Sequence, residues 1–175
     1  MACGHGNCGV VVWRAAVHVF GSSDLSAEKI CERYDLFSAG RWQSLSNMCM
    51  GRCAFTPTPW RSVIYLCGGA RNCLIEVFDG RSMRKLPLRL PEASGVVSWT
   101  HGNCLRVLSR NYICTLTAMP GVSVPTLDIQ SHESSQNYPY QSPALYNDVI
   151  YCVNYPGTVY MYSATHGNKL GYIHR

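Results

Sequence analysis

Two groups of cysteine and histidine have the residue types of a metal site. Cys3, His5 and Cys8 fall close together near the N-terminus, and Cys49 and Cys53 form a C-x-x-x-C pair. Thiolate and imidazole are the usual zinc ligands, but a structural zinc site takes four of them. Neither group is followed by a second C-x-x-C or H-x-H cluster. We therefore expect no metal or cofactor, and interpret these residues as parts of turns and linkers.

Histidine also recurs in the tripeptide HGN, at His5, His101 and His166. A repeated histidine could suggest a shared catalytic or metal site. Gly and Asn, however, both tolerate the left-handed backbone that tight hairpins require. The recurrence is better interpreted as turn chemistry. The sequence also lacks the G-x-S-x-G, P-loop and H-E-x-x-H motifs, so we expect no enzyme.

A polar, tyrosine-rich segment, residues 125–143, is the main candidate for a binding loop. Long loops in compact repeat folds often bind partners, and tyrosine is favoured on recognition surfaces. An equally open alternative is a disordered insertion. If the chain binds another protein, we expect contacts from His132, Tyr138 and Tyr140 in this loop, and from Arg71 and Asn72.

The composition indicates which elements carry these residues. Hydrophobic residues make up 47% of the chain and charged residues 14%, and the 15 Gly, 9 Pro and 11 Tyr point to short strands joined by many turns. We predict an all-β fold. The formal charge is +5, and the basic residues are scattered without a run, so we do not expect nucleic acid as a partner. The sequence has no apolar run of about 18 residues, so we do not expect a membrane as a partner either.

The ten cysteines are spread along the chain, mostly inside apolar runs such as VIYLCGG and DVIYCVN. Free cysteine packs as a small hydrophobic residue. We therefore favour buried, reduced thiols in a cytoplasmic protein, with disulfides as the alternative if the chain is secreted.

Four short β-rich runs resemble one another and define a repeat. Their aligned residues Val17, Ile64, Leu105 and Ile150 are separated by 47, 41 and 45 residues. This period fits one four-stranded antiparallel blade per repeat. The predicted blades span approximately residues 8–45, 52–88, 94–129 and 143–173.

Each run is preceded by a short apolar segment and a turn, as a hairpin requires. The expected turns are RAA, TPWR (residues 58–61), HGN (residues 101–103) and Asn147 with Asp148. In the first repeat, Leu25, Ile30 and Tyr34 also sit near helical spacing. We expect a strand there because the corresponding segments of the other repeats are rich in β-branched and aromatic residues.

The segment from Tyr34 to Gly69 resembles the kelch repeat. Its blade signature is a tyrosine, a tryptophan seven or eight residues later, an arginine in the linker and a glycine pair. The matching residues are Tyr34, Trp42, Arg52, Gly68 and Gly69, and in the next blade Phe78 stands at the tyrosine position. The glycines permit positive φ and close approach, and the aromatic pair can fill the wedge between twisted blades.

The resemblance implies a kelch-type β-propeller that binds another protein, as in substrate adaptors of ubiquitin ligases or cytoskeletal scaffolds. One alternative is a sugar-binding or copper-dependent propeller similar to galactose oxidase. A second is a truncated, non-functional copy. Kelch propellers usually have six or seven blades, so about four blades imply an incomplete ring or part of a longer protein, although closure with four remains an alternative. An open ring would leave two apolar blade faces exposed.

Overall fold

The computed structural model describes residues 4–37, 40–70, 72–93, 96–131, 143–153 and 157–173. The described residues form sixteen strands in four separate four-stranded antiparallel sheets. Within these ranges, no helix is long and apolar enough to span a bilayer. The predicted all-β fold of four blades is confirmed.

Each sheet pairs four consecutive strands in chain order and forms one blade. Blade 1 contains β1 (Gly9–Trp13), β2 (Ala16–Phe20), β3 (Cys31–Asp35) and β4 (Trp42–Ser44). Blade 2 contains β5 (Pro57–Trp60), β6 (Val63–Cys67), β7 (Leu74–Phe78) and β8 (Met83–Arg89). Blade 3 contains β9 (Val97–His101), β10 (Cys104–Leu108), β11 (Tyr112–Thr117) and β12 (Thr126–Ser131). Blade 4 contains β13 (Ala144–Tyr146), β14 (Val149–Val153), β15 (Val159–Ser163) and β16 (Lys169–Ile173).

Every blade begins with a hairpin closed by a two-residue turn. In blade 2 this turn is Arg61 and Ser62, because Trp60 pairs with Val63. The prediction of a turn across residues 58–61 was therefore wrong. Prolines 57 and 59 are accommodated because β5 is an edge strand, bonded only to β6, where a missing N–H leaves the ladder intact. In blade 1 the predicted strand, rather than a helix, is confirmed by β3.

Three hydrophobic cores hold the blades together, each between two consecutive blades. Blades 1 and 2 enclose Phe20, Cys31, Ile64, Leu66 and Phe78. Blades 2 and 3 enclose Tyr65, Ile75, Val77, Leu105, Val107 and Leu116. Blades 3 and 4 enclose Val97, Trp99, Leu108, Ile113, Ile150 and Tyr162.

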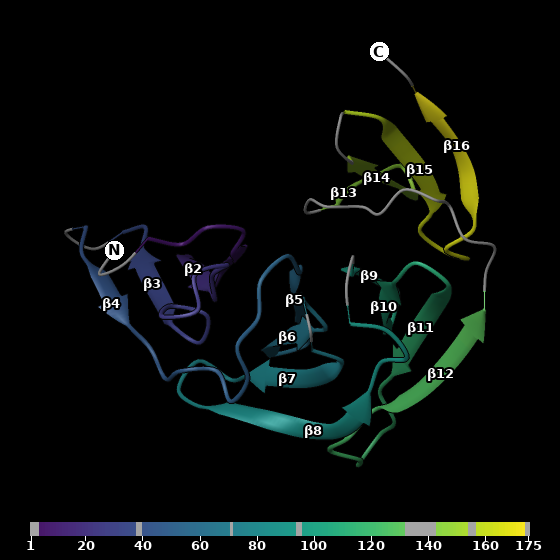
Figure 1. The fold of residues 1–175 in the computed structure, drawn as a ribbon. Helices are drawn as coiled ribbons and strands as arrows, with labels where there is room; N and C mark the ends of the chain where they lie inside the picture. The colour runs from purple at the N-terminus through teal and green to yellow at the C-terminus, as the bar shows by residue number, and fades with distance from the viewer. Residues whose placement is uncertain are drawn as a thin grey trace.

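The blades therefore follow one another in an arc, with blade 1 at one end and blade 4 at the other (Figure 1). None of the three cores formed by the described residues joins blade 4 to blade 1. The expected incomplete ring is what the structure displays.

Candidate functional site

Of the aromatic signature residues, Phe78 packs between blades 1 and 2, whereas Tyr34 and Trp42 pack on each other within blade 1. Tyr34 and Trp42 face each other across β3 and β4, with ring centroids 5.4 Å apart. Phe78, at the equivalent position in blade 2, is fully buried and lies 5.9 Å from the ring of Phe20 in blade 1. These side chains belong to blade surfaces and carry no reactive group.

The glycine pair has the backbone conformation that the sequence predicted. Gly68 and Gly69 have φ of +64° and +106°. A Cβ on Gly68 would come within 2.8 Å of Val96, and one on Gly69 within 3.0 Å of the Cβ of Arg52. Positive φ and close approach both favour glycine here.

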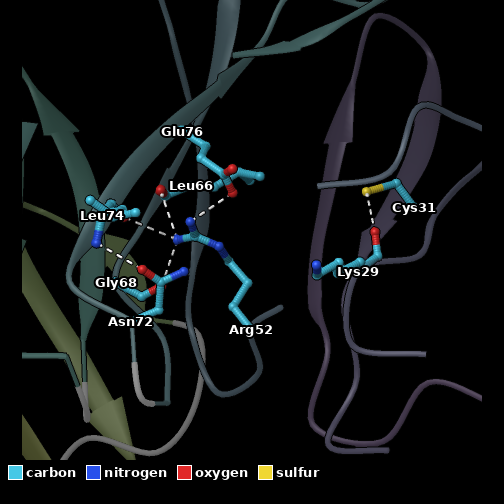
Figure 2. Close-up of polar contacts among 8 residues, drawn as sticks. All are labelled: Lys29, Cys31, Arg52, Leu66, Gly68, Asn72, Leu74 and Glu76. Atoms are coloured by element: carbon cyan, nitrogen blue, oxygen red, sulfur yellow. Dashed lines mark hydrogen bonds and ion pairs between the residues drawn. The ribbon is translucent and has the colours of Figure 1, made fainter. Parts of the chain in front are cut away.

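Arg52 is the most constrained of the signature residues. Its side chain and that of Glu76 are completely buried, and Nη2 donates to Oε2 of Glu76 at 2.7 Å. Nη1 donates to the carbonyl oxygens of Gly68 at 2.6 Å, Leu66 at 3.1 Å and Leu74 at 3.3 Å (Figure 2). Burial lowers the pKa of Arg52 and the Glu76 carboxylate opposes that shift. The linker arginine thus forms a buried polar contact inside blade 2, which we call the brace.

His5 forms the corresponding buried contact in blade 1, although its sequence context indicated only a turn. Its Nδ1 lies 2.8 Å from the carbonyl oxygen of Gly21 and its Nε2 lies 2.7 Å from Oε2 of Glu32. His5 and Gly21 each stand 47 residues before Arg52 and Gly68. This offset of 47 residues was the signal that could have found the equivalence of His5 and Arg52. Glu32 and Glu76 are 44 residues apart and correspond by register, because Glu32 pairs with Val19 and Glu76 with Leu66.

In blades 3 and 4 uncharged side chains stand at the position of the acidic residue. By strand register, Glu76 opposite Leu66 corresponds to Cys114 opposite Val107 and to Tyr160 opposite Cys152. Cys114 is 1% exposed and Tyr160 is 4% exposed. Because a buried carboxylate without its cation is costly, the charge is absent from these cores.

The metal and disulfide alternatives find no support among the described residues. Cys3 lies outside them, and no group of three or more His, Cys, Asp or Glu side chains that could hold a metal occurs within them. None of the nine described cysteines forms a disulfide. Burial raises the pKa of Cys31, Cys67, Cys114 and Cys152 to about 12. These thiols are inert packing groups, as predicted.

Most of the predicted partner-binding residues lie outside the described part of the chain: Arg71, His132, Tyr138 and Tyr140. Asn72 is 5% exposed, and its Oδ1 accepts a hydrogen bond from the backbone N–H of Leu74 at 2.9 Å. It shapes the loop after the glycine pair, and its role in binding stays a prediction. A pocket of about 410 Å³ lies near this loop, between Leu25 and Glu28 of blade 1 and Cys53 and Ala70.

The opposite end of the blades presents a second surface, formed by the first turn of each blade. We call these four turns the inner rim: Arg14 and Ala15, Arg61 and Ser62, Gly102 and Asn103, and Asn147 and Asp148. An aromatic residue or histidine precedes every turn, in chain order Trp13, Trp60, His101 and Tyr146. Turns near these positions were predicted from the sequence, whereas the repeated aromatic position was not.

Contacts between neighbouring turns connect the inner rim from blade to blade. Arg14 donates from Nη2 to the carbonyl oxygen of Ser62 at 3.1 Å. Arg61 donates from Nη2 to Oδ1 of Asn103 at 3.2 Å. His101 Nε2 lies 3.6 Å from Oδ1 of Asp148. Of the HGN tripeptides, which were interpreted as turns, the one at residues 101–103 supplies the first turn of blade 3. His5 precedes β1 at the other end of the strands.

The arginines of the inner rim are held over aromatic rings in a strained backbone. The guanidinium carbon of Arg14 lies 4.1 Å from the ring centroid of Trp13, and that of Arg61 lies 5.7 Å from the ring centroid of Trp60. Their φ angles are +47° and +58°, which costs an L-residue about 1–2 kcal/mol. Such strain persists where other interactions enforce it and is concentrated at functional sites.

The fold defines the class of this protein: it is a β-propeller of four described blades. Neither a protein-family model nor a curated protein matches the sequence. Among solved structures it is similar to one described as "Structure of YjhT", with 13% identity and a TM-score of 0.69. The match covers 98% of this chain but 65% of the YjhT chain. At this identity the likeness concerns the fold alone.

Proposed function

We propose that this chain is a protein-binding scaffold whose inner rim recognises an acidic segment of another protein. The observation that carries the proposal is the pair of exposed arginines, Arg14 and Arg61, fixed over tryptophan rings at consecutive hairpin tips. Tryptophan, tyrosine and arginine dominate the binding energy of protein interfaces. A side chain that is already held in place also loses less entropy on binding.

Backbone strain supports a role for these arginines beyond folding. A two-residue hairpin turn with positive φ prefers Asn-Gly or Asp-Gly. Blade 1 instead has Arg14 and Ala15, both with positive φ. The turn is therefore less stable than the alternatives open to it, as expected where a side chain is kept for recognition.

The finer assignment within this proposal is a kelch-type scaffold. It is supported by the Tyr34 and Trp42 pair, the positive φ of the glycine pair and the linker arginine. The resemblance extends the proposal to substrate recognition for a ubiquitin ligase or to a cytoskeletal partner. Reduced thiols support a cytoplasmic setting, and the absence of a catalytic motif supports a function in binding rather than in catalysis.

The test is binding of a fluorescently labelled random copolymer of glutamate and tyrosine, measured by anisotropy at low and high salt. We expect the wild-type chain to bind, with affinity falling as salt rises. The variant Arg14→Asn/Arg61→Asn should bind at least tenfold more weakly and remain as stable as the wild type, because asparagine tolerates positive φ.

A matched control removes the same charge away from the inner rim. The variant Lys29→Asn/Arg89→Asn changes two exposed cationic residues at the opposite end of the strands, before β3 and at the end of β8, and should retain wild-type affinity. An equal loss of affinity in both variants would show that binding depends only on net charge. It would contradict the proposal that the inner rim is the recognition surface. If the wild-type chain does not bind the copolymer, the proposal of an acidic partner is wrong.

A further inference from the structure

Burial along the strands differs sharply between an internal blade and the last blade. In blade 2 the strands β6 and β7 are buried at four consecutive positions, because both faces of that sheet are covered. In blade 4 the strands β14 and β15 alternate between buried and half-buried residues. One face of blade 4 packs on blade 3, and none of the other described blades covers the opposite face.

The uncovered face of blade 4 is apolar although it faces solvent. We call it the last free face: Val149, Tyr151, Val153, Val159 and Met161. A single solvated face of an antiparallel sheet normally carries polar side chains in alternation with the core. Contiguous apolar patches of this kind mark interaction surfaces.

Blade 1 carries the second face that no other described blade covers, at the other end of the arc (Figure 1). At one end of this face Val19 and Glu32 are buried, and Glu32 contacts His5. We call this face of blade 1 the first free face: Val10, Val12, Val17, Tyr34 and Trp42. Val10 is 46% exposed and Val12 is 61% exposed. The aromatic pair of the sequence signature therefore lies on a surface that no other described blade covers.

The two free faces are the two halves of an interface that already exists three times in the chain. In blade 2 the counterparts of Val17 and Tyr34 are Ile64 and Phe78, which pack against Phe20 of blade 1. This is the core that the first free face would form with a preceding blade.

The last free face has its counterpart in blade 3. Leu108 and Ile113 stand opposite each other in the register, as Val153 and Val159 do in blade 4. In blade 3 these positions are covered by Ile150 of the next blade. The last free face therefore corresponds to the face of blade 3 that packs on blade 4. The first free face corresponds to the face of a following blade that receives it.

We propose that two copies of this chain associate head to tail, the last free face of one copy packing on the first free face of the other. The contact continues the blade-to-blade interface of the fold, so it needs no new type of packing. A head-to-tail pair that closes buries both free faces of both copies, and one that does not close grows into a longer assembly. This inference is independent of the inner rim.

The test combines light scattering after size exclusion with complementary variants. The wild-type mass should rise from 19.5 kDa to at least twice that value as concentration increases. Val12→Glu and Met161→Glu should each remain monomeric, because each loses one of the two faces. Mixing them should restore a dimer, since one intact face of each kind is then available. Val122→Glu, at an exposed valine in a turn of blade 3, should assemble like the wild type.

Three results would overturn the proposal. The first is a wild-type chain that stays monomeric at every concentration while unfolding cooperatively, which would mean that something other than a second copy covers the faces. The second is self-association of Val12→Glu equal to wild type, which indicates pairing of like faces. The third is a mixture of the two folded variants that remains monomeric.

Discussion

The buried pair of Arg52 and Glu76 allows the sharpest test of how this fold is held together. Removing either charge leaves the other buried without a counter-ion, which costs about 3–5 kcal/mol. We therefore expect Arg52→Met and Glu76→Leu each to lower the free energy of unfolding by about that amount. Domains of this size commonly have a stability of only about 5–15 kcal/mol, so each loss should be plainly measurable.

The double variant Arg52→Met/Glu76→Leu should be far more stable than the sum of the two losses implies. It has no isolated charge and resembles blade 3, where Cys114 fills the position of Glu76 and is buried. It does not recover fully, because the carbonyl groups of Leu66, Gly68 and Leu74 lose their donor. At about 1 kcal/mol for each lost hydrogen bond, a residual loss of roughly 3 kcal/mol remains.

The assay is urea unfolding followed by tryptophan fluorescence and circular dichroism, analysed as a double-mutant cycle. We expect a coupling energy of at least about 2 kcal/mol between the two positions. Coincident transitions from the two probes are needed before a two-state analysis is applied. Losses that simply add would refute the argument, because they would show that neither charge depends on the other for its burial.

Three further predictions concern backbone, protonation and thiols. Gly102→Ala should cost about 1–2 kcal/mol for its positive φ alone, because a Cβ there has no neighbour within 4 Å. Gly21→Ala should cost about 3 kcal/mol or more, because its Cβ would also clash with the backbone oxygen of Arg52. Equal urea midpoints for the two variants would contradict the prediction. Burial lowers the pKa of His18 from 6.5, so the unfolded chain takes up a proton first and stability should fall as pH drops below 6.5 until the folded pKa is passed; a His18→Gln variant with an unchanged pH slope would disprove it. With Ellman's reagent, the exposed Cys49 should react in the native state and the buried Cys67 only after denaturation, which mass spectrometry of the labelled peptides can check.

Local patterns in the sequence were sufficient to predict the blades. Hairpin alternation, turn residues and a period of 41 to 47 residues are properties of short segments, and each segment forms the strand that its own pattern indicates. The glycine pair was predicted for the same reason, since positive φ at Gly68 and Gly69 is a local backbone requirement. The one misplaced turn, at residues 58–61, followed from two prolines that an edge strand tolerates.

Only the tertiary structure decided which polar residues are internal. Arg52 and Glu76 are far apart in sequence, and whether such charges meet depends on how the linker crosses the end of its blade. The same holds for His5 with Glu32 and for Arg14 with Ser62, which come together only when blades or strands are packed. Asn72, expected at a surface, is instead buried within its loop.

The sequence by itself determined that the chain forms four blades and that Tyr34 and Trp42 make an aromatic pair. It could not determine that this pair ends on an uncovered face, nor that the inner rim gathers its arginines from successive blades. Strand formation depends on neighbours one to four residues away. Exposure of a blade face depends on whether another blade lies against it, which is a property of the assembled arc.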